Sequence, residues 1–325
     1  MKRRFDVVRA LALAAALIWP EVSSSREAHW PESLTIGTGS EGGTYYVYGE
    51  GLARLLTQEL DLPVVMRPTE GPSQNILLLE TGEIQIGFVT QGVALQAWQS
   101  GGVATGGRPV QAMRAMFPMY DTPFQFVALQ NTGIQSLADL GGRRVGVGPE
   151  GGTGGIYAPR LFRTWAIDAQ LVHGDWAHLA TQLIEGRIDA LAVAAGVPFP
   201  AMADIERSGN IQYIPVAQNQ ILAARLAIPE LGPSLVAAGS YPSLREHYAT
   251  VGLFNFAVVR SDLPDDLVYA IVEAVFANHS RLIEIHPAAV ETVPTDFIRN
   301  SFMPFHNGAA RWYHNNAVTG IISGD

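Results

Sequence analysis

The chain has 325 residues, of which 48% are hydrophobic and 16% are charged, and its formal net charge is −9. This length and composition suit two globular domains, or one large one, with a well-packed core. The negative charge argues against a nucleic-acid partner, because phosphate contacts need clustered basic side chains.

The N-terminal segment carries the single lysine of the chain. Lys2, Arg3 and Arg4 form a basic head, an apolar run follows at 10–19, ALALAAALIW, and small residues follow at 22–25. This order is typical of a secretory signal peptide, and the run is too short to span a membrane. We predict that residues 1–24 are removed and that the mature protein lies in the periplasm. The mature chain then has no lysine and no cysteine, which excludes Schiff-base, Walker A and thiolate chemistry.

From Leu34 onward, short apolar runs alternate with longer helical patterns, as in an α/β protein. The predicted strands cover 34–37, 64–67, 84–89, 112–117, 126–129, 144–147, 169–172, 190–194, 212–215 and 254–259. The predicted helices cover 43–58, 74–81, 156–165, 177–185 and 264–279. A helix–glycine–strand sequence recurs as LETGEIQI at 79–86 and LIEGRIDA at 183–190, which indicates two similar lobes.

The first glycine-rich loop, GTGSEG at 37–42, matches GxGxxG between a predicted strand and a predicted helix. A nicotinamide-binding site is one interpretation, but no carboxylate ends the second strand, where it would bind the ribose. A bare structural turn is another. Small residues before a helix also leave free N–H groups at a positive dipole end, so the loop can bind an anion. Thr44 can add a hydroxyl there, and Tyr45 a ring with a polar tip.

The second glycine-rich loop, GPEGGTGG at 148–155, also follows a predicted strand and opens a helix. Two such helix N-termini, one in each half, can face one ligand from opposite sides, which favours a cleft binder. Asn75 lies at another strand-to-helix junction, where it can either contact a ligand or cap the helix. The small-residue turn at 194–200 follows a strand, where α/β sheets place ligands.

Catalytic constellations are missing from the sequence. Ser40 and Ser73 lack the flanking glycines of a nucleophile elbow, and no histidine pair has HExxH spacing. We therefore predict a protein that is not an enzyme and that uses neither a metal nor a cofactor.

Six segments, in order along the chain, carry a family resemblance. They are LTIGTGSEGGTYYVYGEGLARLL (34–56), GPSQNILLLETGEIQIGFV (71–89), LADLGGRRVGVGPEGGTG (137–154), IEGRIDALAVAAGVPFPAM (184–202), VGLFNFAVVRSDLPDDLVYAIVEAVFAN (251–278) and MPFHNGAARWY (303–313). Over nearly the whole mature chain, the sequence resembles the TAXI-type solute-binding proteins of tripartite ATP-independent periplasmic (TRAP) transporters.

The resemblance implies a type II periplasmic-binding-protein fold, with two α/β lobes joined by hinge strands. Lobe I would comprise 31–124 and 253–325, and lobe II 125–252. A monomer of this kind closes around a small organic anion, such as a carboxylate or an acidic amino acid. It hands the anion to a membrane permease driven by an ion gradient. The ligand-binding residues that the resemblance implies are Ser40, Gly43, Thr44, Tyr45, Asn75, Thr90, Gln91, Gly152, Thr153, Gly154 and Gly196.

The sequence departs from the family pattern at two turns, 90–92 and 151–154, so the usual ligand of the family cannot be carried over. Trp176 or Phe199 could add a wall to the pocket, and Arg67 or Arg225 a positive charge. Two other functions stay open. One is a ligand-sensing subunit of the same fold that presents to a membrane receptor, and the other is an exported nicotinamide-dependent oxidoreductase.

Overall fold

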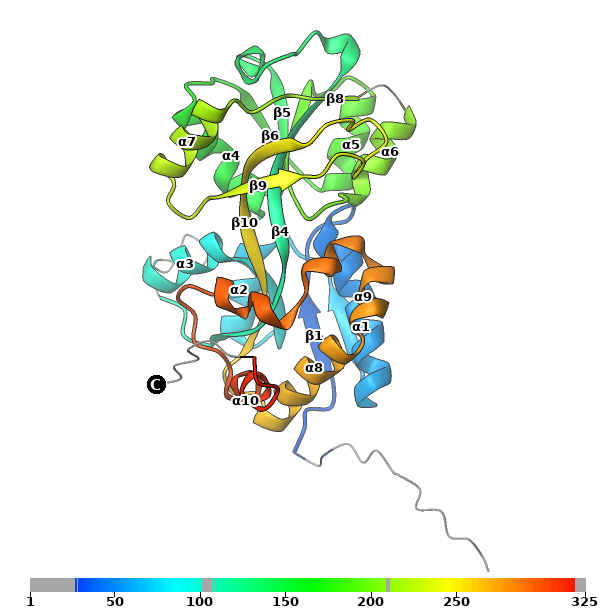
Figure 1. The fold of residues 1–325 in the computed structure, drawn as a ribbon, viewed down its shortest axis with the longest axis vertical. Helices are drawn as coiled ribbons and strands as arrows, with labels where there is room; N and C mark the ends of the chain where they lie inside the picture. Colours follow the sequence, from blue (N-terminus) through cyan, green and yellow to red (C-terminus); the bar gives the residue numbers. More distant parts are fainter. Residues whose placement is uncertain (1–26, 28, 101–106, 108, 209–210, 319–325) are drawn as a thin grey trace, which may run out of the picture.

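A computed structural model describes residues 27, 29–100, 107, 109–208 and 211–318. The predicted signal peptide, 1–24, lies outside the described residues. Two α/β lobes lie one above the other along the long axis (Figure 1). Within the described ranges, no helix is both long enough and apolar enough to cross a membrane.

The first lobe, the lower one in Figure 1, contains both ends of the described chain. Its strand β1 (Leu34–Gly37) pairs in parallel with β2 (Val64–Arg67) and β3 (Ile86–Thr90), and β3 pairs with the antiparallel β10 (Tyr248–Arg260). The helices of this lobe are α1 (Thr44–Leu60), α2 (Pro72–Thr81), α3 (Gln91–Ser100), α8 (Asp265–Ala277), α9 (His279–Ile285) and α10 (Asn307–Asn315). Two 3-10 helices, η4 (Pro287–Glu291) and η5 (Pro294–Arg299), belong to the same part of the chain.

The second lobe repeats this plan around β5 (Arg144–Gly148), which pairs in parallel with β6 (Gln170–His173) and β7 (Ala190–Ala194). Its helices are α4 (Thr153–Thr164), α5 (Trp176–Ile184), α6 (Pro200–Ser208) and α7 (Gln218–Ala227), with 3-10 helices η2 (Gln130–Thr132) and η3 (Leu137–Leu140). Two short strands, β8 (Ile211–Tyr213) and β9 (Gly232–Val236), pair with β4 (Met113–Leu129) and β10 respectively.

The strands β4 and β10 extend through both lobes and pair with each other between them (Figure 1). The sequence predicted two separate strands, 112–117 and 126–129, where the structure has the single strand β4. Pro118 and Pro123 have no backbone N–H to donate in a regular strand ladder. The stretch that contains them therefore looks, in the sequence, like a gap between two strands. The strand tolerates them beside an irregular ladder, whose register shifts between Phe254 and Phe256.

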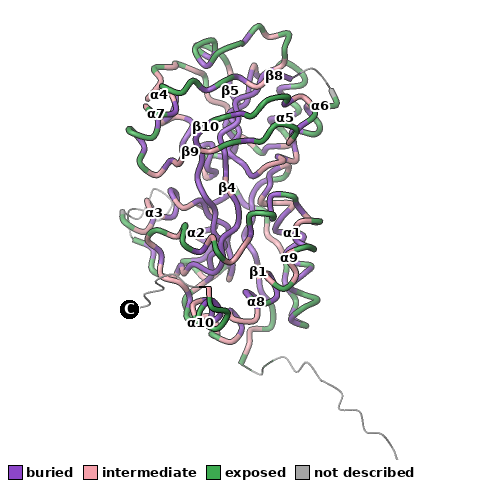
Figure 2. Tube along the Cα trace, in the orientation of Figure 1, coloured by how far each residue is buried: buried purple, intermediate pink, exposed green. Residues whose placement is uncertain are grey.

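The buried apolar side chains form one cluster on the α1 and α8 side and a larger one around β5 and β7. Leu52 and Val268 belong to the first cluster, and Val145 and Leu191 to the second. Buried residues continue along β4 and β10 from one lobe to the other (Figure 2). Each fully buried side chain of this size contributes about 1.5–3 kcal/mol, so burial in both clusters stabilises the shared strands.

Candidate functional site

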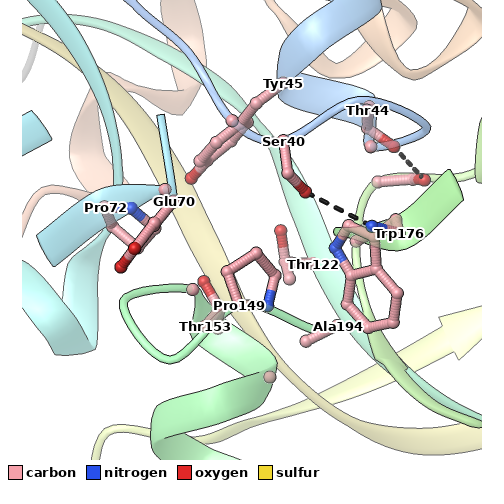
Figure 3. A pocket seen from close by; sticks show the side chains of 17 residues that line it. Ser40, Thr44, Tyr45, Glu70, Pro72, Thr122, Pro149, Thr153, Trp176 and Ala194 are labelled. Carbon is pink, nitrogen blue, oxygen red and sulfur yellow. Dashed lines mark hydrogen bonds between the residues drawn. The ribbon is translucent and has the colours of Figure 1, made fainter. Parts of the chain in front are cut away.

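A cavity lies where the two lobes meet, with loops from both around it (Figure 3). It has about 460 Å³ of empty space, including its open mouth. The lining residues are Gly39, Ser40, Gly43, Thr44, Tyr45, Glu70, Gly71, Pro72, Thr122, Pro149, Gly152, Thr153, Gly154, Trp176, Ala194, Ala195 and Gly196. A cavity between two domains is a preferred place for a small-molecule site.

Two helices begin at the cavity, one from each lobe. Gly43 precedes α1 and Gly152 precedes α4, and both glycines line the cavity without a side-chain cap. The first N–H groups of a helix have no acceptor within the helix, and the aligned peptide dipoles place a partial positive charge there. The two helix ends therefore offer the cavity backbone donors in a positive field.

Buried hydroxyl groups add further donors to the lining. Ser40, Thr122 and Thr153 are 6%, 3% and 6% exposed. The Ser40 oxygen accepts from the backbone N–H of Trp176 at 3.5 Å, and the Thr122 oxygen accepts from the Asn255 side-chain amide at 2.6 Å. In the described part of the chain, neither hydroxyl donates its own hydrogen to a protein acceptor. These two O–H groups are left to serve a ligand that accepts hydrogen bonds.

Tyr45 lines the cavity and also connects it to the shared strands. Its hydroxyl donates to Asn255 Oδ1 at 2.6 Å, and the Asn255 amide donates to the Tyr120 carbonyl at 2.6 Å. Burial raises the pKa of the Tyr45 hydroxyl well above its usual range, so this group stays protonated and donates. The Tyr45 hydroxyl is therefore occupied by its bond to β10, and the Tyr45 ring forms one wall of the cavity.

Hydrogen bonds between the lobes close the cavity. The donor and acceptor pairs are Thr44 Oγ1 to Gly196 O (2.9 Å), Ala177 N to Glu41 O (3.1 Å), Ala201 N to Gly42 O (3.1 Å) and Ser73 N to Gly151 O (3.1 Å). Figure 3 shows the first of them beside the contact between Ser40 and Trp176. Because each bond joins a segment of one lobe to a segment of the other, the structure shows a closed arrangement.

Comparison with known proteins places the chain in a family. The family model described as the NMT1-like family matches residues 36–316. The chain belongs to the NMT1-like family. This membership covers both lobes and every loop that lines the cavity.

Solved structures similar to this NMT1-like protein include three with bound ligands. R. palustris Rpa4515 with adipate is 16% identical, with a TM-score of 0.59, over 89% of this chain and 98% of that one. MatC from Rhodopseudomonas palustris with bound malate is 13% identical, with a TM-score of 0.57, over 88% and 99%. An ancestral arginine-binding protein bound to arginine is 15% identical, with a TM-score of 0.51, over 80% and 98%. At these identities the likeness concerns the fold, and the predicted two-lobe fold of periplasmic binding proteins is confirmed.

The NMT1-like structure brings most of the predicted ligand residues to the cavity. Those that line it are Ser40, Gly43, Thr44, Tyr45, Gly152, Thr153, Gly154 and Gly196. Gly154 has a packing reason as well, because a Cβ there would lie 2.3 Å from the Val147 carbonyl oxygen.

Asn75, Thr90 and Gln91 lie outside this lining. Asn75 is fully buried, and its side chain already binds Thr69, Thr38 and Phe88 within the first lobe. Thr90 is buried behind Thr153, with 3.2 Å between the hydroxyl oxygens. The Gln91 side chain binds the Arg299 carbonyl and the Ser301 hydroxyl instead.

Two of the proposed auxiliary groups have other partners. Phe199 packs against Trp176 at 5.2 Å between ring centroids, but of the two only Trp176 lines the cavity. Arg67 pairs with Glu83 at 3.1 Å, and Arg225 is exposed on α7, so neither arginine reaches the lining.

The sequence analysis missed the lining residues Glu70, Gly71, Pro72 and Thr122, of which Glu70 and Thr122 have polar side chains. Thr122 lies in the part of β4 that the sequence treated as a break. Glu70 follows β2 and precedes α2, so the rule that ligands bind beyond the carboxyl ends of parallel strands could have found it. Over the described ranges, no group of three or more metal-binding side chains is placed to hold an ion.

Proposed function

We propose that this NMT1-like protein is a TAXI-type solute-binding protein that captures a small organic anion with a carboxylate group. The observation that carries the proposal is the meeting of two helix N-termini from opposite lobes, those of α1 and α4, at one cavity. The free O–H groups of Ser40 and Thr122 supply donors at the same place. A carboxylate only accepts hydrogen bonds, so it matches these donors.

Lobe closure would couple binding to recognition by a membrane partner. A ligand that touches both lobes only when they are closed shifts the population toward the closed form. We propose the lobe boundaries 31–124 with 253–325, and 125–252, with β4 and β10 as the hinge strands. The closed, loaded monomer would then deliver its ligand in the periplasm to the permease of a TRAP transporter, which uses an ion gradient.

The test is ligand screening of the purified mature chain. Thermal shift against a panel of carboxylates and amino acids should show a rise in Tm with at least one compound. At 100 times Kd, a ligand adds about 2.7 kcal/mol to the free energy of unfolding. Small-angle scattering should show a smaller radius of gyration in the presence of the same compound. Flat melting curves across the panel, together with no co-purified small molecule, would overturn the proposal.

The delivery step needs its own measurement. Uptake of the identified compound into vesicles that contain a TRAP permease should require the binding protein and an ion gradient, and should continue without ATP. Uptake that depends on ATP hydrolysis would contradict the TRAP assignment and leave the binding function standing.

A further inference from the structure

Asn255 is a fully buried polar side chain near the middle of the shared strand β10. The register between β10 and β4 shifts at this residue, so that two residues of β4, Met119 and Tyr120, lie opposite Asn255 alone. An extra residue in one strand is the mark of a β-bulge, which interrupts the ladder and can turn a side chain toward a site. The Tyr120 carbonyl accepts from the Asn255 side-chain amide at 2.6 Å.

The hydrogen bonds of Asn255 fix the orientation of its amide group. A carbonyl oxygen can only accept, so the Asn255 atom that faces the Tyr120 carbonyl must be the amide nitrogen. The second N–H of this nitrogen donates to Thr122 Oγ1, also over 2.6 Å. The amide oxygen accepts from the Tyr45 hydroxyl at 2.6 Å. The backbone of β4 therefore decides that Thr122 accepts from Asn255 and that Tyr45 donates to it.

The two hydroxyl neighbours of Asn255 both line the cavity, and Asn255 gives them opposite roles (Figure 3). Tyr45 uses its hydrogen in the bond to Asn255 and presents its ring. The Thr122 oxygen receives an N–H from Asn255, so the Thr122 hydrogen cannot be directed at that nitrogen. This hydrogen is left for the cavity, where it suits a group that only accepts.

We propose that Asn255 is a positioning residue of the binding site, which makes Thr122 a hydrogen-bond donor toward the carboxylate of the ligand. This inference rests on the proposed function, since it concerns how the same cavity recognises an anion. Asn255 lies outside the lining, so it acts through Thr122 and not by contact with the ligand. Its position on β10 also connects this donor to the hinge strands, because the bulge of β4 supplies the carbonyl that holds the amide.

The test is a double-mutant cycle on ligand affinity that combines Asn255→Asp with Thr122→Val. The probe is the member of a carboxylate panel, which includes acetate, pyruvate, succinate and glutarate, that raises the Tm of the wild type most. Its Kd is measured by calorimetry. In the wild type, Thr122→Val should raise Kd by about tenfold or more, because it removes a hydrogen bond to a charged group.

The Asn255→Asp background should abolish most of that effect. An aspartate carries at most one hydrogen where the amide nitrogen carries two, and the Tyr120 carbonyl takes it. The Thr122 hydrogen then turns to the aspartate oxygen and is lost to the ligand. Thr122→Val should therefore raise Kd by less than about threefold in this background. If Asn255→Asp does not fold, Asn255→Ala takes its place, and the effect of Thr122→Val should again be smaller than in the wild type.

The matched control is Asn75→Asp. Asn75 is also fully buried, its amide donates to two carbonyls and its oxygen accepts from a threonine hydroxyl, but none of these partners lines the cavity. In the Asn75→Asp background, Thr122→Val should raise Kd as much as in the wild type. A merely structural role of Asn255 would give the same result in the Asn255 background.

An equal effect of Thr122→Val in all backgrounds would overturn the inference. A Thr122→Val variant that binds the probe as tightly as the wild type would overturn it too. In both cases the carboxylate still binds, and the proposed function stands. If no compound of the panel binds the wild type, both proposals fail.

Discussion

The hydroxyl of Thr44 donates to the carbonyl of Gly196 over 2.9 Å, and this bond joins the N-terminus of α1 to the loop after β7 in the other lobe. Both residues are buried, and both line the cavity. A bond between lobes can form only when the lobes are together. The contact therefore connects closure of the molecule to the shape of the cavity.

Replacement of Thr44 by valine should weaken ligand binding. Valine has nearly the same shape but no hydroxyl, so the Gly196 carbonyl would be buried without its partner on closure. An unsatisfied buried group costs about 1–3 kcal/mol, so calorimetry should show a higher Kd and a binding free energy weakened by that amount. Thr44→Ser keeps the donor and should restore most of the affinity. If serine and valine weaken binding equally, the hydroxyl is not what holds the lobes together.

Replacement of Gly42 by alanine should hinder closure. Gly42 has φ +82°, and a Cβ there would lie 2.7 Å from the backbone nitrogen of Ala177 in the facing lobe. We expect ligand affinity to fall by about tenfold or more, because the binding-competent closed form becomes less populated. Small-angle scattering with saturating ligand should show a more extended molecule than the wild type.

A glycine with the same backbone conformation provides the control. Gly239 has φ +81° with nothing within 4 Å of a Cβ, so Gly239→Ala carries the same backbone strain without the contact. Both variants should lose about 1–2 kcal/mol of stability from the left-handed conformation. An equal loss of affinity in the two variants would mean that strain, and not the contact with Ala177, causes the effect.

Asn75→Ala should lower the stability of the fold and leave ligand affinity almost unchanged. The Asn75 amide donates to the carbonyls of Thr38 and Phe88 at 2.8 and 2.9 Å, and its oxygen accepts from the Thr69 hydroxyl at 2.8 Å. Each group left unpaired costs about 1–3 kcal/mol, so the urea midpoint of unfolding should fall clearly. Where the variant is still folded, its Kd should stay close to that of the wild type. A large loss of affinity at unchanged stability would instead give Asn75 a direct role in the ligand site.

Asp121→Asn should change how stability depends on pH. Asp121 lies in β4, where its carboxylate accepts from the Ser234 hydroxyl and its N–H donates to Glu291 at 2.8 Å. Burial raises the pKa of Asp121, and burial raises that of Glu291 too. An acid with a raised pKa contributes stability below its unfolded-state pKa of about 4, and this contribution is lost as the pH rises through the folded-state pKa.

The asparagine variant lacks that titration. Its free energy of unfolding relative to the wild type should therefore increase between acid and neutral pH, measured by urea unfolding at several pH values. Asp204→Asn, a substitution at an exposed position on α6, serves as the control for the loss of one surface carboxylate. A constant difference between Asp121→Asn and the wild type would show that Asp121 does not titrate in this way.

Local patterns predicted a large part of the fold. The ranges predicted for β1, β2 and β7 agree with the structure because each is a short apolar run next to a turn signal. The loops at 37–44 and 148–155 were also predicted to open helices and to bind a ligand, and the structure brings both to one cavity.

The rest depended on distant neighbours. Nothing local tells whether Asn75 faces a ligand or fills a gap between strands, since Thr38 and Phe88 become its partners only in the folded lobe. The short strand β9 was missed because its pairing with β10 depends on tertiary structure and not on an apolar pattern of its own. The position of Glu70 beside Gly151 of the other lobe, where a Cβ would lie 3.2 Å from Glu70 Oε2, likewise exists only in the folded molecule.

The continuity of β4 and β10 has a consequence for any attempt to take the molecule apart. β4 pairs with β7 through Phe124–Ala128 and with β10 from Met113 to Pro123, and β10 in turn pairs with β3. A fragment that ended between the lobes would lose a central strand of its own sheet. Neither half should therefore fold when expressed alone, and heating the whole chain should produce a single calorimetric peak instead of two.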